Sequence, residues 1–304
     1  RNGTTPDNIA VKNTSHELRY AIKYPFSPIT AIIVNVFGRE DRDIFQSTNQ
    51  TGIETPDKVT YWAGFKIEYV LDNTIPKGLN LYNGTRFKIF YERYYNMQDE
   101  NVQLNAAGFD FRHYQKIHRQ LIFCSRLTYN TSFGPAKVKY ILGGVDNTIS
   151  PAYDKSNNAI SSENFVFQAL ATNMRGFNQN IRNGNSFAVM NYEIRFPVFT
   201  YLFNRPIHSD FLTNFQLVPF FDIGTAWSGI SPYSEENTYN QKIVEVANIK
   251  ATVINVRDPI VAGLGGGLRT KLLGYFIRGD VAWGIQDSEL IKTPVYYFSL
   301  STDF

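Results

Sequence analysis

An arginine, a glycine and an aromatic residue in a long polar segment have the clearest chemical potential in this chain. Arg175, Gly176 and Phe177 follow one another within residues 132–185. A loop of this length in a compact domain is usually functional. A guanidinium can form two parallel hydrogen bonds with one carboxylate, which fixes the orientation of both groups. Gly176 suits a sharp turn. The alternative for Arg175 is a solvated loop arginine.

Candidate partners for this arginine lie in later segments, where apolar and polar residues alternate. Charged residues and glycines fall there on the face opposite the apolar side chains: Asp222, Gly224, Gly263, Gly265, Gly267, Arg269, Arg278 and Asp280. Glycines on such a face leave room for another backbone to approach the strand, although they could also be ordinary strand kinks.

Residues with the spacing of a catalytic or metal site are not evident. The four histidines are His16, His113, His118 and His208, and none has metal-ligand spacing with the single cysteine, Cys124. The chain has no Gly-x-Ser-x-Gly motif. An outer-membrane phospholipase would place a serine and a histidine at the rim of a membrane barrel, and His113 is the one candidate for that histidine. The glycines of residues 263–267 lack the Lys-Ser/Thr of a phosphate-binding loop. We therefore expect no enzyme activity, no metal and no cofactor.

The composition narrows the class of protein. Charged residues make up 19% of the 304 residues and aromatic residues 15%, with 24 Phe and 19 Tyr. A net charge of +3 does not indicate a partner such as a nucleic acid. No run of eighteen apolar residues predicts a transmembrane helix. Because the chain begins at Arg1 rather than Met, we expect a mature or truncated piece.

Eleven segments, ten of them 9–13 residues long, show the alternation of a strand with one apolar face. They are residues 17–25, 30–38, 59–71, 85–95, 102–114, 119–131, 186–198, 211–227, 259–270, 274–285 and 294–304, with loops expected at 1–15 and 39–58. This length crosses a bilayer as a tilted strand, whereas soluble strands are usually shorter. Long segments at 132–185 and 229–258 contrast with a tight joint at Leu272-Leu273, as in outer-membrane barrels. The pattern predicts an all-β, antiparallel transmembrane barrel, with a soluble tyrosine-rich β-domain as the alternative.

Motifs in the second half resemble those of a known family. Residues 175–177 look like its Arg-Gly-Phe/Tyr loop motif, and residues 220–227 like its aromatic-Asp-x-Gly strand. Residues 263–269 and then 277–280 look like its Gly-x-Gly-x-x-Arg and Arg-x-Asp pair. Order and spacing resemble the outer-membrane assembly and translocation barrels, the bacterial surface antigen family of BamA, TamA and the two-partner-secretion transporters.

The end of the chain adds to this resemblance. Phe298, Leu300 and Phe304 resemble the terminal strand signal of such barrels. The family barrel has sixteen strands, so we expect about five upstream of Arg1. The alternatives are that the bounds given above merge neighbouring strands, or that the chain joins separate pieces of the barrel. Residues 132–185 would then fold into the lumen, and residues 229–258 would form an extracellular insert.

The resemblance also implies contacts and a function. Arg175 would meet Asp222 inside the barrel, with Asp280 as a second acid nearby, and Phe177 would pack against the lumen wall. The chain would be the C-terminal part of a bacterial outer-membrane barrel that helps to insert or translocate other proteins. Its partners would be outer-membrane lipid, client proteins, and periplasmic proteins or lipoproteins.

Two shorter stretches are similar to one subgroup. Residues 142–147 and 231–234 look like those of large Bacteroidetes proteins that carry a TolB-like propeller before the barrel. This leaves an alternative function open. The barrel would then be an anchor or channel for a fused or bound soluble domain, such as a propeller or a lipase, whose activity lies outside this chain.

Overall fold

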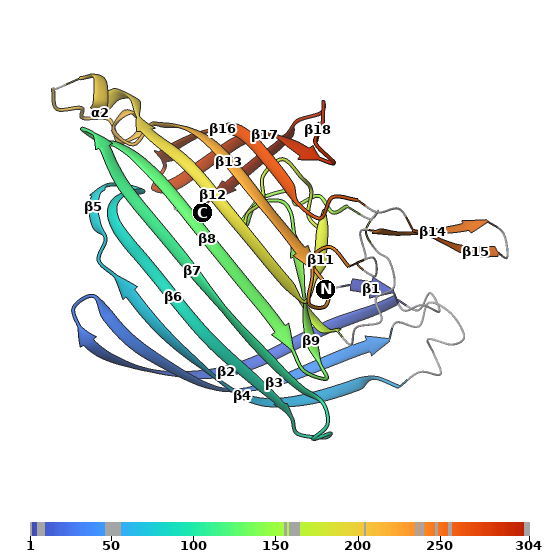
Figure 1. Ribbon diagram of the computed structural model, residues 1–304. Coiled ribbons are helices and arrows are strands. Elements are labelled where there is room, and N and C mark those ends of the chain that lie inside the picture. The colour runs from blue at the N-terminus through green and yellow to red at the C-terminus, as the bar shows by residue number, and fades with distance from the viewer. Residues whose placement is uncertain are drawn as a thin grey trace.

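A single antiparallel sheet of fourteen strands forms a curved wall in the computed structural model (Figure 1). The model describes residues 2–4, 10–45, 56–154, 157, 165–203, 205–234, 237, 240–246, 249–254 and 257–300. The strands follow the order β1-β2-β3-β4-β6-β7-β8-β12-β13-β16-β17-β18, with β19 also paired to β17 and β5 to β6. In the described part of the chain, no pairing joins the β1–β2 end of this order to the β18–β19 end.

The eleven predicted strands are all present in this wall. Their bounds are β2 Ala10–Ser27, β3 Thr30–Phe45, β4 Lys58–Asp72, β6 Leu81–Asn96, β7 Gln103–His118, β8 Leu121–Phe133, β12 Ser186–Pro197, β13 Gln216–Trp227, β16 Val261–Leu272, β17 Tyr275–Gln286 and β19 Val295–Leu300. Three short strands complete it: β1 Asn2–Thr4, β5 Ile75–Gly78 and β18 Glu289–Leu290. The prediction of an all-β antiparallel fold is confirmed.

The predicted loops at 1–15 and 39–58 were wrong for most of the residues that the structure describes there, because β2 and β3 continue beyond the apolar stretches that identified them. Residues 1, 5–9 and 46–55 of these predictions lie outside the described residues. Residues 10–15 and 39–45 are strand, with His16 opposite Glu40 in the ladder. The charged side chains pair along β3, as Arg39 does with Asp41 at 2.8 Å. Backbone hydrogen bonds therefore extend the sheet past the apolar band, where alternation of apolar residues gives no signal.

The predicted strand over residues 211–227 begins too early. Residues 198–215 instead hold two short helices, α2 Val198–Leu202 and α3 Asp210–Thr213. Ser209 caps α3 by accepting a hydrogen bond from the Leu212 amide at 3.4 Å. Neither described helix has the length or apolarity needed to cross a membrane.

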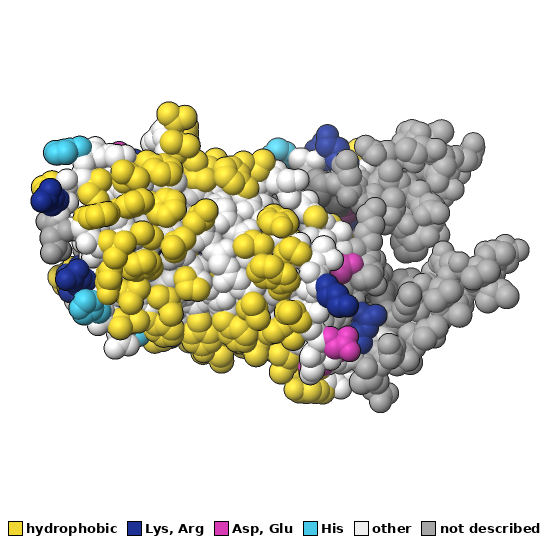
Figure 2. Space-filling model, turned by 90° about the horizontal axis from the view of Figure 1, so that it is seen from above, with side chains coloured by type: hydrophobic (Ala, Val, Ile, Leu, Met, Phe, Trp, Pro, Cys, Tyr) yellow, Lys and Arg dark blue, Asp and Glu magenta, His cyan; other side chains and the backbone are white. Residues whose placement is uncertain are grey.

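The outward face of the wall carries large apolar side chains on every long strand. Leu18, Ile67, Ile89 and Leu268 are all more than 40% exposed. Figure 2 shows one face of the molecule, where hydrophobic side chains cover the middle and Lys, Arg, Asp, Glu and His side chains lie mostly towards the two ends. A surface of this kind is typical of a barrel that faces lipid.

The two ends of the wall differ in the length of their connections. At one end, Pro28-Ile29, Arg119-Gln120 and Leu273-Gly274 are two-residue turns between neighbouring strands. At the other end lie the segments that connect β8 to β12 and β13 to β16. The second of these contains the hairpin of β14 Gln241–Val246 and β15 Ile249–Ile254, which projects away from the wall in Figure 1.

The segment between β8 and β12 folds against the inner face of the wall. It contains a three-stranded sheet in the order β10-β9-β11, with bounds β9 Lys137–Leu142, β10 Phe165–Leu170 and β11 Arg182–Gly184. We call residues 132–185 the lumen segment. Buried residues of the wall and of this segment form one apolar cluster, which includes Phe37, Trp62, Tyr94, Tyr140, Leu142, Met174 and Phe177. The core of the molecule therefore lies between the wall and the lumen segment.

Candidate functional site

The Arg-Gly-Phe stretch forms the tip of the lumen segment between β10 and β11. An amide–carbonyl hydrogen bond of 2.9 Å from Met174 to Gly144 folds the tip back on its own segment. Gly176 has φ +96°, and a Cβ there would lie 2.8 Å from backbone atoms of Trp283 and Gly284 on β17. The turn and the close approach to the wall both require glycine at this position. The tip consequently delivers the Arg175 side chain to β12 and β13.

Arg175 and Asp222 form a buried bidentate pair. The Nε and Nη2 atoms of Arg175 each lie 2.7 Å from a different oxygen of Asp222, and the Arg175 amide donates to the same carboxylate at 3.0 Å. Asn191 adds a fourth donor at 2.9 Å. The arginine is 1% exposed and the aspartate 0%. Burying two charges costs several kcal/mol each, roughly, unless hydrogen bonds of this quality satisfy them.

Glu193 on β12 is the second acid of the site, and the sequence did not single it out. Its Oε1 lies 2.7 Å from Arg175 Nη1 and 2.6 Å from Arg269 Nη2, and its Oε2 accepts from Arg195 Nε at 2.9 Å. One carboxylate therefore joins three arginines from three parts of the chain. The alternation of β12 already placed Glu193 on the inward face, which was the one signal available.

Asp280 is close enough to Arg175 for their charges to interact, as the resemblance implies. Its ion pair, however, is with Arg278 of the same strand, at 3.3 Å. Arg278 is the ladder partner of Arg269, and both are 1% exposed. The site thus extends along the inner face from Asp222 on β13 to Asp280 on β17.

The inward glycines make space for the tip and for the charged side chains. A Cβ on Gly263 would lie 1.8 Å from the carbonyl oxygen of Arg175, so no side chain fits there while the tip is docked. At Gly265 it would meet the Phe220 ring, and at Gly267 the Asp280 carboxylate. The Phe177 ring lies against Gly284, a glycine that the sequence did not single out.

The remaining predicted site residues lie elsewhere. Gly224, two residues after Asp222 on β13, packs against Val189 on β12 and makes room for no part of the tip in these contacts. Phe298 and Leu300 are 48% and 45% exposed on the outward face of β19. Phe304 lies outside the described residues.

The charged side chains of this site are buried, and they hold one another in fixed orientations. The guanidinium of Arg175 stacks on the Phe220 ring at 3.7 Å from its centre, in addition to its two carboxylate partners. Within the described residues, no group of three or more His, Cys, Asp or Glu side chains could hold a metal ion. The site can therefore hold the lumen segment against the wall in one orientation.

Comparison with known proteins matches this architecture. Residues 64–304 match the family model of the Omp85 superfamily domain. The chain belongs to the Omp85 superfamily. It is accordingly a β-barrel protein of the bacterial outer membrane.

One solved structure shares the fold, and a second is similar over much of the chain. The structure of BamA from Haemophilus ducreyi lacking POTRA domains 1-3 is similar with a TM-score of 0.57 and 11% identity, over 95% of this chain and 54% of that one. CdiB from Acinetobacter baumannii is similar with a TM-score of 0.49 and 12% identity, over 95% of this chain and 42% of that one. This chain thus spans about half the length of the structures it matches. No curated protein matches the sequence.

Proposed function

We propose that this barrel assists the insertion or translocation of client proteins at the bacterial outer membrane, and that this activity requires the docked lumen segment. The buried Arg175–Asp222–Glu193 cluster is the observation that carries the proposal. It fixes the tip by hydrogen bonds to strands β12 and β13, so the segment is held in one orientation. In this proposal the lumen segment shapes the inner face, and no cofactor takes part.

Partners and outer regions follow from the same proposal. Client proteins would reach the barrel from the periplasm, where periplasmic proteins or lipoproteins would deliver them. Residues 229–258 would form an extracellular insert, because they lie at the end of the wall with the long connections. A propeller of the TolB type upstream of the barrel stays a prediction.

The proposal is tested with the full protein in lipid vesicles and an unfolded outer-membrane protein as client. The rate at which the client becomes folded is measured for the unchanged protein, for Arg175→Ala and for Asp222→Ala. Each substitution leaves the other charge buried without its main partner, which costs about 3–5 kcal/mol. We expect each to reduce the acceleration of client folding at least tenfold.

Arg86→Ala is the matched control. Arg86 also pairs with an aspartate at one end of β4, Asp72, at 3.0 Å, but both side chains are about one-third exposed or more. We expect this variant to retain full activity. If Arg175→Ala and Asp222→Ala insert the client as fast as Arg86→Ala does, the proposed role of the lumen segment is wrong. If the unchanged barrel does not accelerate the client at all, the anchor or channel alternative takes its place.

A further inference from the structure

A cavity of about 440 Å³ lies on the outward face of the wall, where β8 ends, β12 begins and β13 ends. Alternation from the exposed Tyr192 and Phe221 places Ser186 and Trp227 on the outward face. The ladder sets Thr131, Ser186 and Trp227 in one row across the three strands. This end of the wall carries the long connections, which we place at the outer side of the membrane. The cavity therefore lies at the level of the outer membrane surface.

Aromatic and apolar side chains form one part of its lining. The rings of Tyr129 and Trp227 lie 6.3 Å apart between centres, with their planes at 37°. Phe133 and Ile230 add exposed apolar side chains. Aromatic side chains with an apolar body and a polar end are favoured at membrane interfaces. This part of the lining suits the apolar face of a sugar ring and the first carbons of an acyl chain.

Hydroxyl and amide groups form the other part of the lining. The hydroxyls of Thr131 and Ser186 lie 2.8 Å apart. The Asn185 side chain donates to the Ser132 carbonyl at 2.7 Å and accepts from the Gly229 amide at 2.8 Å, so it is held in one orientation. These groups can exchange hydrogen bonds with a ligand that carries hydroxyls of its own.

Two further side chains point to the kind of ligand. Trp227 is 8% exposed, and within the described residues its indole N–H meets no acceptor. A buried donor of this kind is stabilised when a ligand supplies an oxygen atom. Lys137, half-buried at the start of β9, lines the same cavity and adds a positive charge. A hydroxylated ligand with a negative charge matches both groups.

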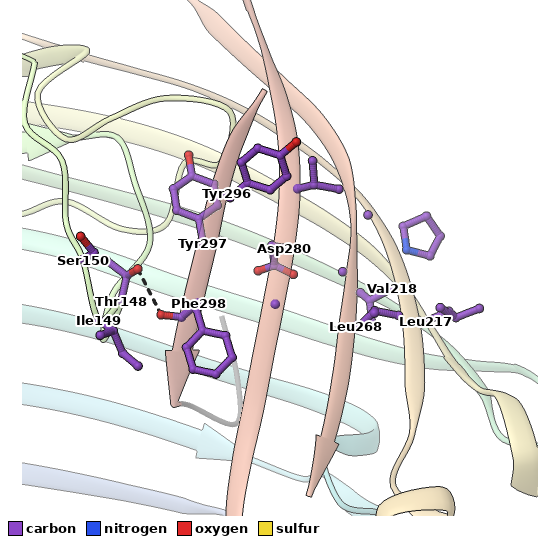
Figure 3. A pocket seen from close by; sticks show the side chains of 15 residues that line it. Thr148, Ile149, Ser150, Leu217, Val218, Leu268, Asp280, Tyr296, Tyr297 and Phe298 are labelled. Atoms are coloured by element: carbon purple, nitrogen blue, oxygen red, sulfur yellow. Dashed lines mark hydrogen bonds between the residues drawn. The ribbon is translucent and has the colours of Figure 1, made fainter. Parts of the chain in front are cut away.

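A larger cavity of about 840 Å³ lies between β13, β16, β17 and β19, and its lining differs in kind (Figure 3). Leu217, Leu268 and Phe298 contribute to a largely apolar lining, which in the described part of the chain includes no lysine or arginine. The charge that it carries is on Asp280, which pairs with Arg278 at 3.3 Å. This cavity does not suit an anion, so the cation of the smaller cavity distinguishes the ligand of that site.

We propose that the cavity around Trp227 and Lys137 binds the phosphorylated sugar head group of a glycolipid in the outer leaflet of the membrane. Lys137 holds the phosphate by a charge-assisted hydrogen bond, as basic pockets on membrane proteins hold lipid head groups. The Trp227 N–H and the hydroxyls contact sugar oxygens, and the rings contact the start of the acyl chains. The position at the membrane surface favours a lipid over a free sugar, because the chains of the lipid keep its head group at this level.

The site is tested with the full protein in phosphatidylcholine nanodiscs that contain increasing fractions of lipid A, a diphosphorylated diglucosamine lipid. Native mass spectrometry counts the lipid A molecules bound per barrel. Lys137→Gln should weaken binding about tenfold or more, because the phosphate loses its charged partner. Lys137→Arg keeps the charge and should bind within about threefold of the unchanged protein.

Lys271→Gln is the matched control for Lys137→Gln. Lys271 pairs with Asp210 at the opposite end of the wall, so its loss should leave lipid A binding unchanged. Equal binding by the two glutamine variants would show that the cavity is not the site. Trp227→Phe keeps a ring but removes the N–H, and should weaken binding about threefold or more, whereas Trp283→Phe on the outward face of β17 should not. Equal affinities for these two would overturn the role of the indole.

Two further lipids separate the phosphate from the sugar. The same diglucosamine lipid without its phosphates should bind about tenfold more weakly, and equal binding would overturn the role of Lys137. Phosphatidylglycerol carries a phosphate without a sugar and should also bind more weakly than lipid A. Equal binding of phosphatidylglycerol would show charge attraction alone and overturn the glycolipid site. Client folding is not measured here, so failure of this inference is distinct from failure of the proposed function.

Discussion

The two halves of the wall hold the same lumen segment by different physics. On the first half, aromatic rings make the contact: Tyr94 of β6 lies 5.6 Å from Phe167 of β10 between ring centres, and Arg39 of β3 lies over that ring at 4.3 Å. On the second half, the buried cluster of Arg175, Asp222 and their neighbours makes it. Apolar packing is non-directional, whereas a bidentate ion pair fixes orientation.

This difference predicts where a substitution will weaken the attachment of the lumen segment most. The ion pairs on the inner face of the first half are partly exposed, as with Lys66 and Glu68 at 17% and 13% side-chain exposure. Those between Arg175 and its two acids are 0–1% exposed. The loss of one atom or charge should therefore lower the free energy of unfolding strongly in the second half and only slightly in the first half.

The largest effect is expected from Glu193→Gln. This change leaves Arg175, Arg195 and Arg269 without the carboxylate that joins them, and the loss of one partner from a buried cluster costs about 3–5 kcal/mol. The measurement is urea unfolding of the barrel in lipid vesicles, followed by tryptophan fluorescence. Glu68→Gln, in a pair that water reaches, should cost about 1 kcal/mol or less. Similar costs for the two variants would contradict the distinction between the halves.

A smaller but specific effect is expected from Gly263→Ala. The new methyl group would overlap the Arg175 carbonyl, and overpacking of this kind costs about 1–3 kcal/mol. Gly266→Ala on the same strand is the control, because a Cβ there meets nothing within 4 Å. Unfolding in vesicles and protease access to the lumen segment should both change for Gly263→Ala alone. A tip that stays protected in both variants would show that the close approach is not needed.

The smallest effect is expected from Phe167→Leu, on the side held by aromatic rings. Leucine keeps the apolar contact with reduced volume, and such changes usually cost about 1.5 kcal/mol or less. Client folding in vesicles should proceed at an unchanged rate. A loss of activity as large as that of Arg175→Ala would mean that both halves fix the segment equally.

Much of the fold could be predicted from the sequence, because alternation along a strand is a local property. The period of two assigned Leu264 and Leu268 to the outward face and Gly265 and Gly267 to the inner one, without knowledge of any neighbour. The same rule failed where it had no apolar signal, as in the extension of β3 through Arg39. The rule also failed at Phe211. This residue lies in helix α3, which Ser209 caps, and alternation of apolar residues does not predict such a helix.

Local sequence patterns were enough to predict the wall, because its strands, their two faces and the motifs of the superfamily depend on residues near one another in the chain. Which inward side chains meet depends on how the chain folds. Glu193 hydrogen-bonds Arg175, and Tyr297 binds the tip, because register across the strands and the path of the lumen segment bring them together. Such contacts join residues up to 121 positions apart, so no local pattern can encode them.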